Sequence, residues 1–481
     1  MKRVLPWLGL ASAPLLLAGL SWLLAAPAAP SAESRAAAQR VEAGWAYSWL
    51  VGLQKRFPAR EPGTQAHRGG VELIAESFHE ATGAVRVDSP ADGPRGPIFN
   101  VLARVRGRDP ARRVLLAAHH DSVPGAPGAI DDGGAVAALL AAARALRAGP
   151  PPPCDVEFAI FDYEEWGLLG AKAHARAEAL SSRPSHLAVV AVELVGWHQD
   201  DLVAHTIPHG FAWDAPGIAP AWLPAALRRA GRAAGQPVGL GDPLVSPWYQ
   251  ATIRVLSVQT GSDAGAFSEL GHPAAMLTGS SLSNFYAHYH QPSDDLSQVD
   301  PTRLDDAARV VTAAAWELGA LSDPPRALGA PYLDLGERVL GRAALGLIQL
   351  LAALALGLAA VDARRLGRGA EALGLAGLWA ALVGLGALAS PLGALCFVPL
   401  ASALVVARHL APAGRVLLLL LGAAPALIEV LLVVAASSNF GFGWRGGAAE
   451  TGLILLALAA SVLASAASES PGPNPPALKS D

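Results

Sequence analysis

The stretch VLLAAHHD, residues 114–121, joins an apolar run to two imidazoles and a carboxylate. An unbroken apolar run predicts a strand that is buried on both faces, which is typical of the centre of a parallel sheet. Polar residues at the end of such a strand lie at the carboxyl edge of the sheet, where open α/β folds form their sites. In this position Asp121 could accept the second N–H of a metal-bound His119. Taken alone, the stretch also fits structural histidines.

The stretch PGAIDDGG, residues 127–134, leads into an Ala-rich segment that is predicted to be a helix. Two interpretations of Asp131 and Asp132 remain open from the residues alone. An aspartate before a helix commonly caps free backbone N–H groups. A carboxylate that projects from such a tight loop could also bridge two cations.

Two further acidic positions follow or interrupt apolar strands. In IFDYEEWG, residues 160–167, Glu164 and Glu165 come directly after an almost uncharged strand, which argues against an ordinary surface pair. One acid of such a pair can bind a metal while its neighbour takes a proton from metal-bound water. Glu193 lies inside the run VVAVEL, residues 189–194, where a charge is costly unless it is paired in a salt bridge or bound to metal.

The last polar stretch, HYHQPSDD, covers residues 288–295. A single loop histidine usually has no special role, but His290 is followed by a proline and by Asp294, which could orient its ring. The chain has only two cysteines, Cys154 and Cys396, and we expect neither a disulfide nor a cysteine zinc site. Any metal would therefore be held by His, Asp and Glu.

The segments around these stretches alternate between helix and strand patterns. Helices are predicted at 36–55, 66–82, 133–147, 167–180 and 303–320, and strands at 98–105, 114–118, 156–161, 187–194 and 253–258. Strands separated by helices favour right-handed crossovers and a largely parallel, buried sheet. Residues 195–252 are rich in Pro, Gly, Trp and His, and either shape a substrate site or form an irregular cover.

The composition points to a membrane protein. The chain has 481 residues, of which 52% are hydrophobic and only 16% charged, and this is too apolar for a purely soluble protein. The net charge of -4 and the lack of a long basic run make nucleic-acid binding a poor interpretation. Residues 4–26 form an apolar run after Lys2 and Arg3, and either a cleaved signal peptide or a retained anchor fits it. We favour the anchor, and both interpretations place the following residues outside the cytoplasm.

The C-terminal third contains repeated apolar runs that predict about five transmembrane helices. They lie at 343–361, 370–388, 392–407, 415–436 and 451–467. Arginines in the connectors 362–369 and 408–415 place both connectors in the cytoplasm by the positive-inside rule. Glu429, inside the fourth run, either marks a pathway or simply faces the interior of the bundle. An all-helical soluble core is the alternative.

Taken in order, the five polar stretches resemble the M28 metallopeptidases, an aminopeptidase family with co-catalytic zinc. The family pattern is His-x-Asp, a Gly-rich loop with Asp-Asp, Glu-Glu-x-Gly, an acid at a strand end, and a final His followed by Asp. Residues 36–321 carry the resemblance, and Gly261-Ser262-Asp263 is similar to the family's stretch before the final His. The resemblance implies a mixed, mostly parallel α/β sheet flanked by helices, as in zinc exopeptidases, followed here by the all-α transmembrane bundle.

The resemblance also implies two zinc ions and their ligands. One zinc would be bound by His119 and Glu193, and the other by Glu165 and His290. Asp131 would bridge the two ions. Such a set of nitrogen and oxygen donors suits zinc.

The same resemblance assigns the remaining roles. Glu164 would be the general base, and Asp121 would support His119. Asp132 and Asp294 would not bind metal but would help to position the residues that do. The peptide bond before Asp132 is typically cis in the family. His120 is an alternative ligand.

The sequence departs from the family at three places. The mildest is Gly133-Gly134-Ala135, where the family usually has Gly-Ser-Gly. Glu193 stands where many members have Asp, so the pocket geometry could differ. The tyrosine that helps to hold the oxyanion in soluble members is missing from Val258–Gly261, and Tyr249 or Tyr289 could replace it.

We therefore expect a membrane-bound zinc peptidase, most simply an aminopeptidase, that meets peptide substrates and membrane lipid but no nucleic acid; protein partners are unknown. A carboxypeptidase or dipeptidase, a glutaminyl cyclase-like acyltransferase with one zinc, an inactive ectodomain and a transporter are the alternatives. The protein would be integral to the plasma (inner) membrane, with the peptidase on the extracytoplasmic (periplasmic or extracellular) side. Expected domains are 1–34 (signal peptide or anchor), 35–322 (peptidase), 323–341 (linker), 342–467 (transmembrane region) and 468–481 (cytoplasmic Pro-rich tail).

Overall fold

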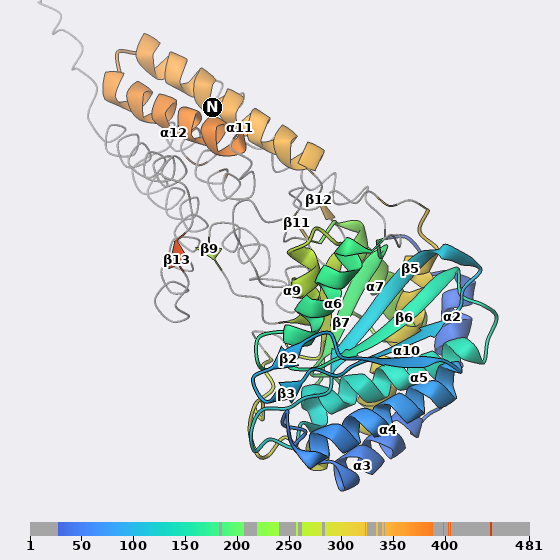
Figure 1. Ribbon diagram of the computed structural model, residues 1–481. Coiled ribbons are helices and arrows are strands. Elements are labelled where there is room, and N and C mark those ends of the chain that lie inside the picture. The colour runs from blue at the N-terminus through green and yellow to red at the C-terminus, as the bar shows by residue number, and fades with distance from the viewer. Residues whose placement is uncertain are drawn as a thin grey trace, which may run out of the picture. The chain divides into compact units, whose positions relative to one another are not determined.

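The computed structural model describes two compact parts of the chain (Figure 1). The described residues are 27–181, 185–205, 219–239, 262–280, 284–322 and 342–387, with isolated short stretches at 256–257, 324, 333–334, 339–340, 398, 403, 405 and 443–444. The larger unit takes its described residues from 27–246 and 258–330, and the smaller unit takes its described residues from 247–257 and 331–481.

A seven-stranded mixed sheet forms the centre of the larger unit, counted over the described residues. Its order is β1 (Val85–Asp88), β4 (Asn100–Val105), β6 (Cys154–Phe161), β5 (Asp109–His119), β7 (Ala188–Glu193), β10 (Ala274–Thr278) and β8 (Val203–His205). The strands from β6 to β10 pair in parallel, whereas β1, β4 and β8 pair antiparallel with their neighbours. The expected mixed α/β sheet is thus confirmed, with the parallel pairing confined to its centre.

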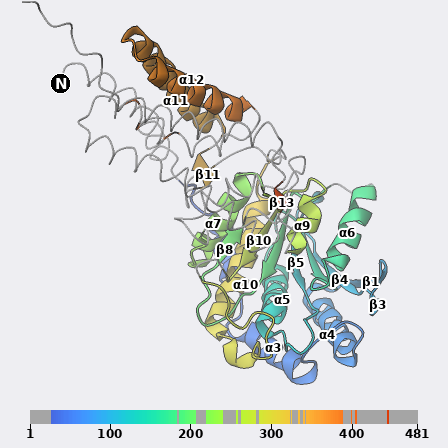
Figure 2. The same ribbon diagram turned by 90° about the vertical axis from the view of Figure 1, so that its left-hand side faces the viewer.

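Helices cover both faces of this sheet (Figures 1 and 2). They are α2 (Ala32–Ala38), α3 (Trp45–Arg56), α4 (Gln65–Thr82), α5 (Ala135–Arg147), α6 (Leu169–Leu180), α7 (Trp222–Ala234), α9 (Asp263–Ser268) and α10 (Pro301–Gly319). Short helical turns η1 (Ala129–Gly134) and η2 (Leu296–Gln298) and a small hairpin of β2 (Asp92–Gly93) and β3 (Gly96–Pro97) complete the unit.

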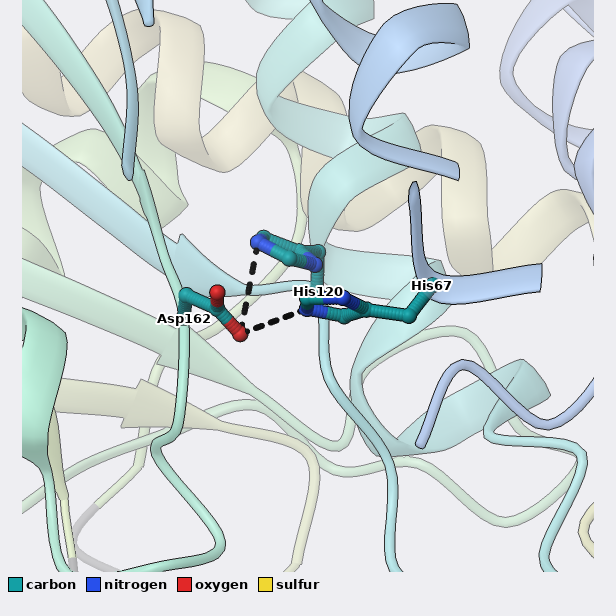
Figure 3. Close-up of side chains that lie close together, drawn as sticks. All are labelled: His67, His120 and Asp162. Atoms are coloured by element: carbon teal, nitrogen blue, oxygen red, sulfur yellow. Dashed lines mark hydrogen bonds and ion pairs between the residues drawn. The ribbon is translucent and has the colours of Figure 1, made fainter. Parts of the chain in front are cut away.

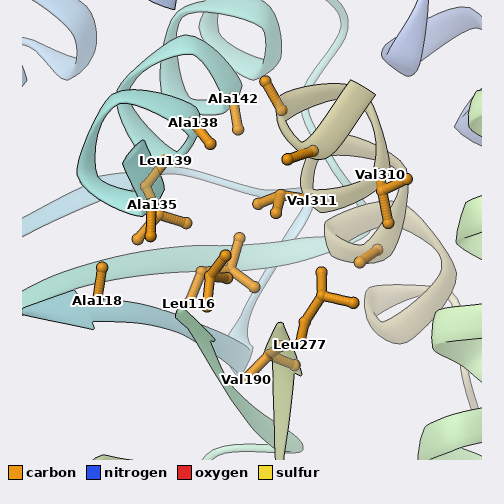
Figure 4. Close-up of a cluster of buried hydrophobic side chains, with 14 of the residues drawn as sticks. Leu116, Ala118, Ala135, Ala138, Leu139, Ala142, Val190, Leu277, Val310 and Val311 are labelled. Carbon is orange, nitrogen blue, oxygen red and sulfur yellow. The ribbon is translucent and has the colours of Figure 1, made fainter. Parts of the chain in front are cut away.

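The central strands are buried on both faces because alternate side chains meet different helices. Leu116 of β5 lies in a cluster with Leu139 of α5 and Val311 of α10 (Figure 4). Its neighbour Leu115 belongs to a second cluster, which contains Phe267 of α9. Successive strand residues point to opposite faces, so a strand with two apolar faces needs an unbroken apolar run. This explains why the run before His119 shows no polar alternation.

The chain before residue 35 is also part of the larger unit. Ser31 caps α2, and its backbone N–H and hydroxyl donate to Glu317 of α10 at 2.9 and 3.1 Å. Ser34 donates to the same carboxylate at 2.7 Å, and Arg229 of α7 donates to its other oxygen at 3.0 Å. These contacts tie α2 to α7 and α10.

One expected helix is wrong as a single element. Residues 36–55 form α2 and α3, separated at Gly44, whose φ of 73° lies in the left-handed region that glycine adopts easily. The helices expected at 66–82, 133–147, 167–180 and 303–320 correspond to α4, α5, α6 and α10, and the strands expected at 98–105, 114–118, 156–161 and 187–194 to β4, β5, β6 and β7. Of the strand expected at 253–258, the structure describes only β9 (Leu256–Ser257), which pairs with β13 (Gly443–Trp444) and not with the central sheet.

The described part of the smaller unit contains two long helices, a short hairpin and the β9–β13 pair. The helices and the hairpin are α11 (Arg342–Arg365), α12 (Gly369–Ala387), β11 (Leu333–Asp334) and β12 (Val339–Leu340), and α11 packs against α12. In the described part of the chain, the segment Gly346–Arg365 is the one helix that is long and apolar enough to cross a membrane. The expected span 370–388 corresponds to α12, which does not meet this criterion. The three remaining expected spans, Glu429 and the N-terminal run lie wholly or almost wholly outside the described residues, so the five-helix bundle is not confirmed.

Candidate metal centre

Three parallel strands end at the same edge of the sheet and bring polar side chains together. His119 is the last residue of β5, and Glu193 is the last residue of β7. Glu164 and Glu165 lie in the turn that follows β6, the neighbour of β5 on the side opposite β7, and Asp131 lies in η1. The site therefore forms at the carboxyl ends of adjacent strands, as expected for an α/β fold.

Asp131 lies between two histidines. Its Oδ1 is 3.3 Å from His119 Nε2, and its Oδ2 is 3.4 Å from His290 Nε2. His290 Nε2 also lies 2.9 Å from Glu165 Oε2. The ligating atoms of His119, Asp131 and Glu165 all lie within 4.8 Å of one another. The structure thus brings these four expected ligands into one cluster.

Glu193 belongs to the same cluster through its electrostatic surroundings. Burial raises the pKa of its carboxyl to about 7, and the nearby charges of Asp131 and Glu165 act in the same direction, while His119 opposes them. The side chain is buried, and its Oε1 has no hydrogen-bond partner among the described residues. All five expected ligands therefore lie at this edge of the sheet.

The residues fit a divalent cation, and the evidence is their unbonded oxygens. Glu165 Oε1 and Glu193 Oε1 are both buried without a hydrogen-bond partner in the part of the chain that the structure describes. Buried polar atoms are normally paired, and like charges that share a buried site disfavour ionisation. A cation would satisfy both requirements, and donors of nitrogen and oxygen only are compatible with zinc.

Glu164 has the surroundings of a proton-transfer group. Burial raises the pKa of its carboxyl well above the usual range, His119 opposes the shift, and Glu193 and Asp263 add to it. A carboxyl group whose pKa lies closer to neutrality accepts and returns a proton more readily than an ordinary glutamate.

Asp121 joins the strand ends that carry these residues. Its two carboxylate oxygens accept the backbone N–H groups of Glu164 at 3.0 Å and Glu165 at 3.3 Å. Its backbone carbonyl oxygen lies 3.1 Å from His119 Nδ1, whereas its nearer carboxylate oxygen is 3.7 Å from that nitrogen. The closest acceptor for the His119 ring is thus the carbonyl of Asp121 and not its side chain, because the side chain is bonded to the glutamate turn.

Asp132 joins a second pair of strand ends. Its carboxylate accepts the backbone N–H of His119 at 3.2 Å and that of Leu194 at 3.3 Å. The peptide bond between Asp131 and Asp132 is cis, as the family resemblance implied. Asp132 therefore holds the ends of β5 and β7 against the loop that carries Asp131.

Asp294 supports a different residue from the one expected. Its carboxylate accepts the backbone N–H groups of Ile130 at 2.9 Å and Asp131 at 3.2 Å, and the Tyr286 hydroxyl at 2.8 Å. Among the described residues it makes no bond to the His290 ring, so the suggestion that it orients His290 is wrong. It positions the loop of Asp131 instead, because the chain folds back over η1 after His290.

The ring side chains of His120 and Tyr289 lie near the ligands in the sequence and have different surroundings. The ring of His120, the alternative ligand, lies beside His67 and Asp162 (Figure 3), with its Nε2 3.0 Å from the Phe99 carbonyl oxygen. Tyr289 stacks on His290 with ring centroids 3.7 Å apart. Burial and then the charges of the metal-site carboxylates raise its pKa, so the hydroxyl stays protonated and can donate. Tyr249 lies outside the described residues.

Asp263 is a site residue that the sequence did not assign. It is the first residue of α9, only 1% exposed, and neither carboxylate oxygen has a hydrogen-bond partner among the described residues. Burial raises its pKa well above the usual range, and Glu193 and Asp121 contribute while His119 opposes. Its Ser-Asp pair was part of the family resemblance, and that pair was the available signal.

The comparisons with known proteins bear on the family that the sequence resembles. Residues 100–315 match the model of Peptidase family M28. Leucine aminopeptidase 1 of Emericella nidulans is 27% identical over 46% of this chain and 55% of its own length. Leupeptin-inactivating enzyme 1 of Streptomyces exfoliatus is 28% identical over 47% of this chain and 50% of its own. The expected resemblance is thus confirmed over residues 100–315, which match the M28 peptidase family.

The structural comparison is consistent with the same fold. LapB of Legionella pneumophila superposes with a TM-score of 0.51 at 15% identity, covering 60% of this chain and 76% of that one. At this identity the likeness shows the fold alone. The chain spans about half the length of the curated relatives that it matches.

Two buried carboxyl groups, one in the metal site and one outside its ligand set, predict how the stability of the metal-free protein depends on pH. Burial raises the pKa of Glu193 and of Asp200 to about 7. A carboxyl group with a raised pKa stabilises the fold fully below its unfolded pKa of about 4, and this contribution disappears as the pH rises through about 7. We expect the melting temperature of EDTA-treated protein to fall between pH 5 and pH 8, and zinc to raise it more at pH 8.

The variant Asp200→Asn is the control, because Asp200 is not among the expected ligands. It should reduce the difference between the melting temperatures at pH 5 and pH 8. The rise in melting temperature on adding zinc should stay the same. Equal melting temperatures at pH 5 and pH 8 for the metal-free protein would contradict this account of the site.

Proposed function

We propose that this protein is a membrane-bound aminopeptidase with two zinc ions, which removes N-terminal residues from peptides outside the cytoplasm. The observation that carries the proposal is Asp131, whose two oxygens lie 3.3 and 3.4 Å from His119 and His290. A carboxylate placed between two ligand pairs is what a two-metal site needs. The M28 family match and a curated relative named as a leucine aminopeptidase support peptide-bond hydrolysis.

The expected ligands divide into two sets around this bridge. His119 and Glu193 would hold one zinc, and Glu165 and His290 would hold the other, with Asp131 shared. Zinc bound there would polarise the scissile carbonyl and lower the pKa of water. The unbonded oxygens of Glu165 and Glu193 are the atoms that such ions would satisfy.

The chain's own residues then move the protons. Glu164 takes a proton from the attacking water as the oxygen–carbon bond forms. It returns the proton to the leaving nitrogen as the carbon–nitrogen bond breaks, which releases a free amine. Asp121, which accepts the Glu164 backbone N–H at 3.0 Å, keeps the general base in place. Tyr289 would donate its hydroxyl to the oxyanion that forms on the carbonyl.

The membrane part of the proposal rests on the surface of α11. Leu347, Leu350, Leu354 and Leu358 are 42–55% exposed, and their spacing places them along one face of the helix. Water disfavours such an apolar stripe, and lipid would cover it. Arg364 and Arg365 end the helix, and the positive-inside rule puts that end in the cytoplasm.

We retain the expected domains as part of the proposal. The peptidase domain takes residues 35–322, the linker 323–341 and the transmembrane region 342–467, with a signal peptide or anchor before them. We change only the upstream boundary of the peptidase domain, because the contacts of Ser31 and Ser34 with Glu317 favour including these residues in it.

Replacing the general base gives the main test of the reaction. In full-length protein, Glu164→Gln should lower kcat/KM for release of amino acids from unblocked peptides by about 10²–10⁴-fold. Its zinc content, measured by elemental analysis, should stay at two per chain. Glu80→Gln, at an exposed position on α4, is the matched control and should keep full activity.

Three results would redirect the proposal. Full activity in Glu164→Gln would remove Glu164 from its role. One zinc per chain with cyclisation of N-terminal glutamine would favour a glutaminyl cyclase-like acyltransferase. Release from the C-terminus of N-blocked peptides would favour a carboxypeptidase.

The variant Tyr289→Phe tests the oxyanion donor. We expect kcat to fall by about 10²–10³-fold, because one donor to the transition state is lost, with little change in KM. The zinc content should not change, since the phenol is not a ligand. Tyr47→Phe on α3 serves as the control. If Tyr289→Phe turned over peptides at the normal rate, another group would have to hold the oxyanion.

Single cysteines test the membrane topology in intact cells. Gly367→Cys, between α11 and α12, should react with a membrane-impermeant maleimide only after the cell membrane has been permeabilised. Leu180→Cys, at a site 89% exposed in the larger unit, should react from outside. Equal labelling of both from the same side, or release of the protein by alkaline carbonate, would contradict the proposed topology.

A further inference from the structure

A second polar cluster lies buried in the larger unit and has no part in the expected ligand set. It consists of His67 from α4, His120, which directly follows β5, and Asp162, which directly follows β6 (Figure 3). The three residues are 1%, 0% and 0% exposed. Buried charged groups are costly, so such a cluster needs a function or a structural reason.

Asp162 is the centre of this cluster. His67 Nε2 lies 2.8 Å from Asp162 Oδ1, and His120 Nε2 lies 3.7 Å from the same oxygen. Although burial opposes ionisation, His120 and the hydrogen bond from His67 hold the pKa of Asp162 below its usual value. The two imidazole rings lie 5.1 Å apart. His67 is thus a donor to a buried carboxylate.

A third metal is a poor explanation of these contacts. His67 Nε2 and Asp162 Oδ1, 2.8 Å apart, lie at the distance of a direct hydrogen bond. Both oxygens of Asp162 also accept backbone N–H groups, from Tyr163 at 2.8 Å and Phe99 at 2.8 Å. His120 Nε2 lies 3.0 Å from the Phe99 carbonyl oxygen. The atoms that face one another are therefore already hydrogen-bonded.

Asp162 controls the turn that carries the catalytic acids. The Tyr163 backbone has a φ of 54°, in the left-handed region, which is unfavourable for a residue with a side chain. The surroundings must hold this conformation, and the bond from Tyr163 N–H to Asp162 Oδ1 does so directly. The next two residues are Glu164 and Glu165. The direction of their side chains thus depends on how firmly Asp162 is fixed.

His67 is itself fixed by the start of α4. Its backbone N–H donates to the side chain of Thr64, which caps the helix, at 3.1 Å. The imidazole therefore reaches Asp162 from a helix end whose position is set. On the other side of the turn, Asp121 accepts the N–H groups of Glu164 and Glu165 at 3.0 and 3.3 Å. The turn is held from both sides by carboxylates.

We propose that His67 is a positioning residue for the catalytic turn: through Asp162 it fixes the left-handed backbone at Tyr163 and so aims Glu164 and Glu165. The inference rests on the proposed function for the roles of these two glutamates. The contacts themselves do not depend on that function. What His67 supplies is one N–H donor at a fixed place, in a region that water does not reach.

The pair His67→Leu and His67→Gln in the full-length protein tests this role. Leucine fills the space without a donor, whereas glutamine keeps an N–H group within reach of Asp162. We expect His67→Leu to lower kcat and the affinity for the more weakly held zinc by about 10–100-fold each, as is typical when an outer partner of a metal site is lost. KM should change little, and His67→Gln should recover most of both losses. His79→Ala, at an exposed site on α4, is the control.

Zinc affinity is measured by competition with a chelating dye, and this measurement needs no substrate. It therefore tests the positioning role of His67 independently of the proposed peptidase activity. Full activity in Glu164→Gln would remove the proposed function, and the zinc affinity of His67→Leu would still test the positioning role. A lower melting temperature with unchanged kcat and zinc affinity would overturn the inference, since His67 would then only stabilise the fold. A third zinc in the wild type that His67→Leu lacks would overturn it as well.

Discussion

The site is governed by the cost of burying negative charge at one edge of the sheet. Five carboxyl groups meet there, and two histidines oppose them. The acids are Asp131, Glu164, Glu165, Glu193 and Asp263, and the histidines are His119 and His290. Ionised carboxylates in one buried site repel each other unless protons or cations compensate. Divalent cations are therefore the natural partners of this cluster, and its chemistry follows from them.

A second set of acids builds the scaffold that keeps the first set together. Asp121, Asp132, Asp162 and Asp294 each accept backbone N–H groups from the loops around the site. Each therefore fixes a turn that would otherwise have free donors at a strand end. The loops are aligned by these bonds, and the parallel strands bring them to a common edge. The arrangement explains why so many aspartates occur where apolar strands end.

The sequence was most informative where an apolar strand runs directly into acids, because this pattern has few structural explanations. The ends of β5, β6 and β7 could be predicted in this way. Strand β10 was missed, because its sequence AAMLT lacks β-branched residues except Thr278 and resembles a helix. Asp294 was given the wrong target, since its bond to Asp131 spans 163 residues and is decided by tertiary packing. Asp263 had only its short Ser-Asp pair as a signal.

The claim on which this account depends is that two zinc ions lie on either side of Asp131. Anomalous diffraction at the zinc edge from crystals of the zinc-loaded, full-length protein tests it most directly. The account predicts two peaks about 3.5–4 Å apart, one beside His119 and Glu193 and one beside Glu165 and His290, with Asp131 between them. A single peak, or peaks that do not contact Asp131, would contradict it.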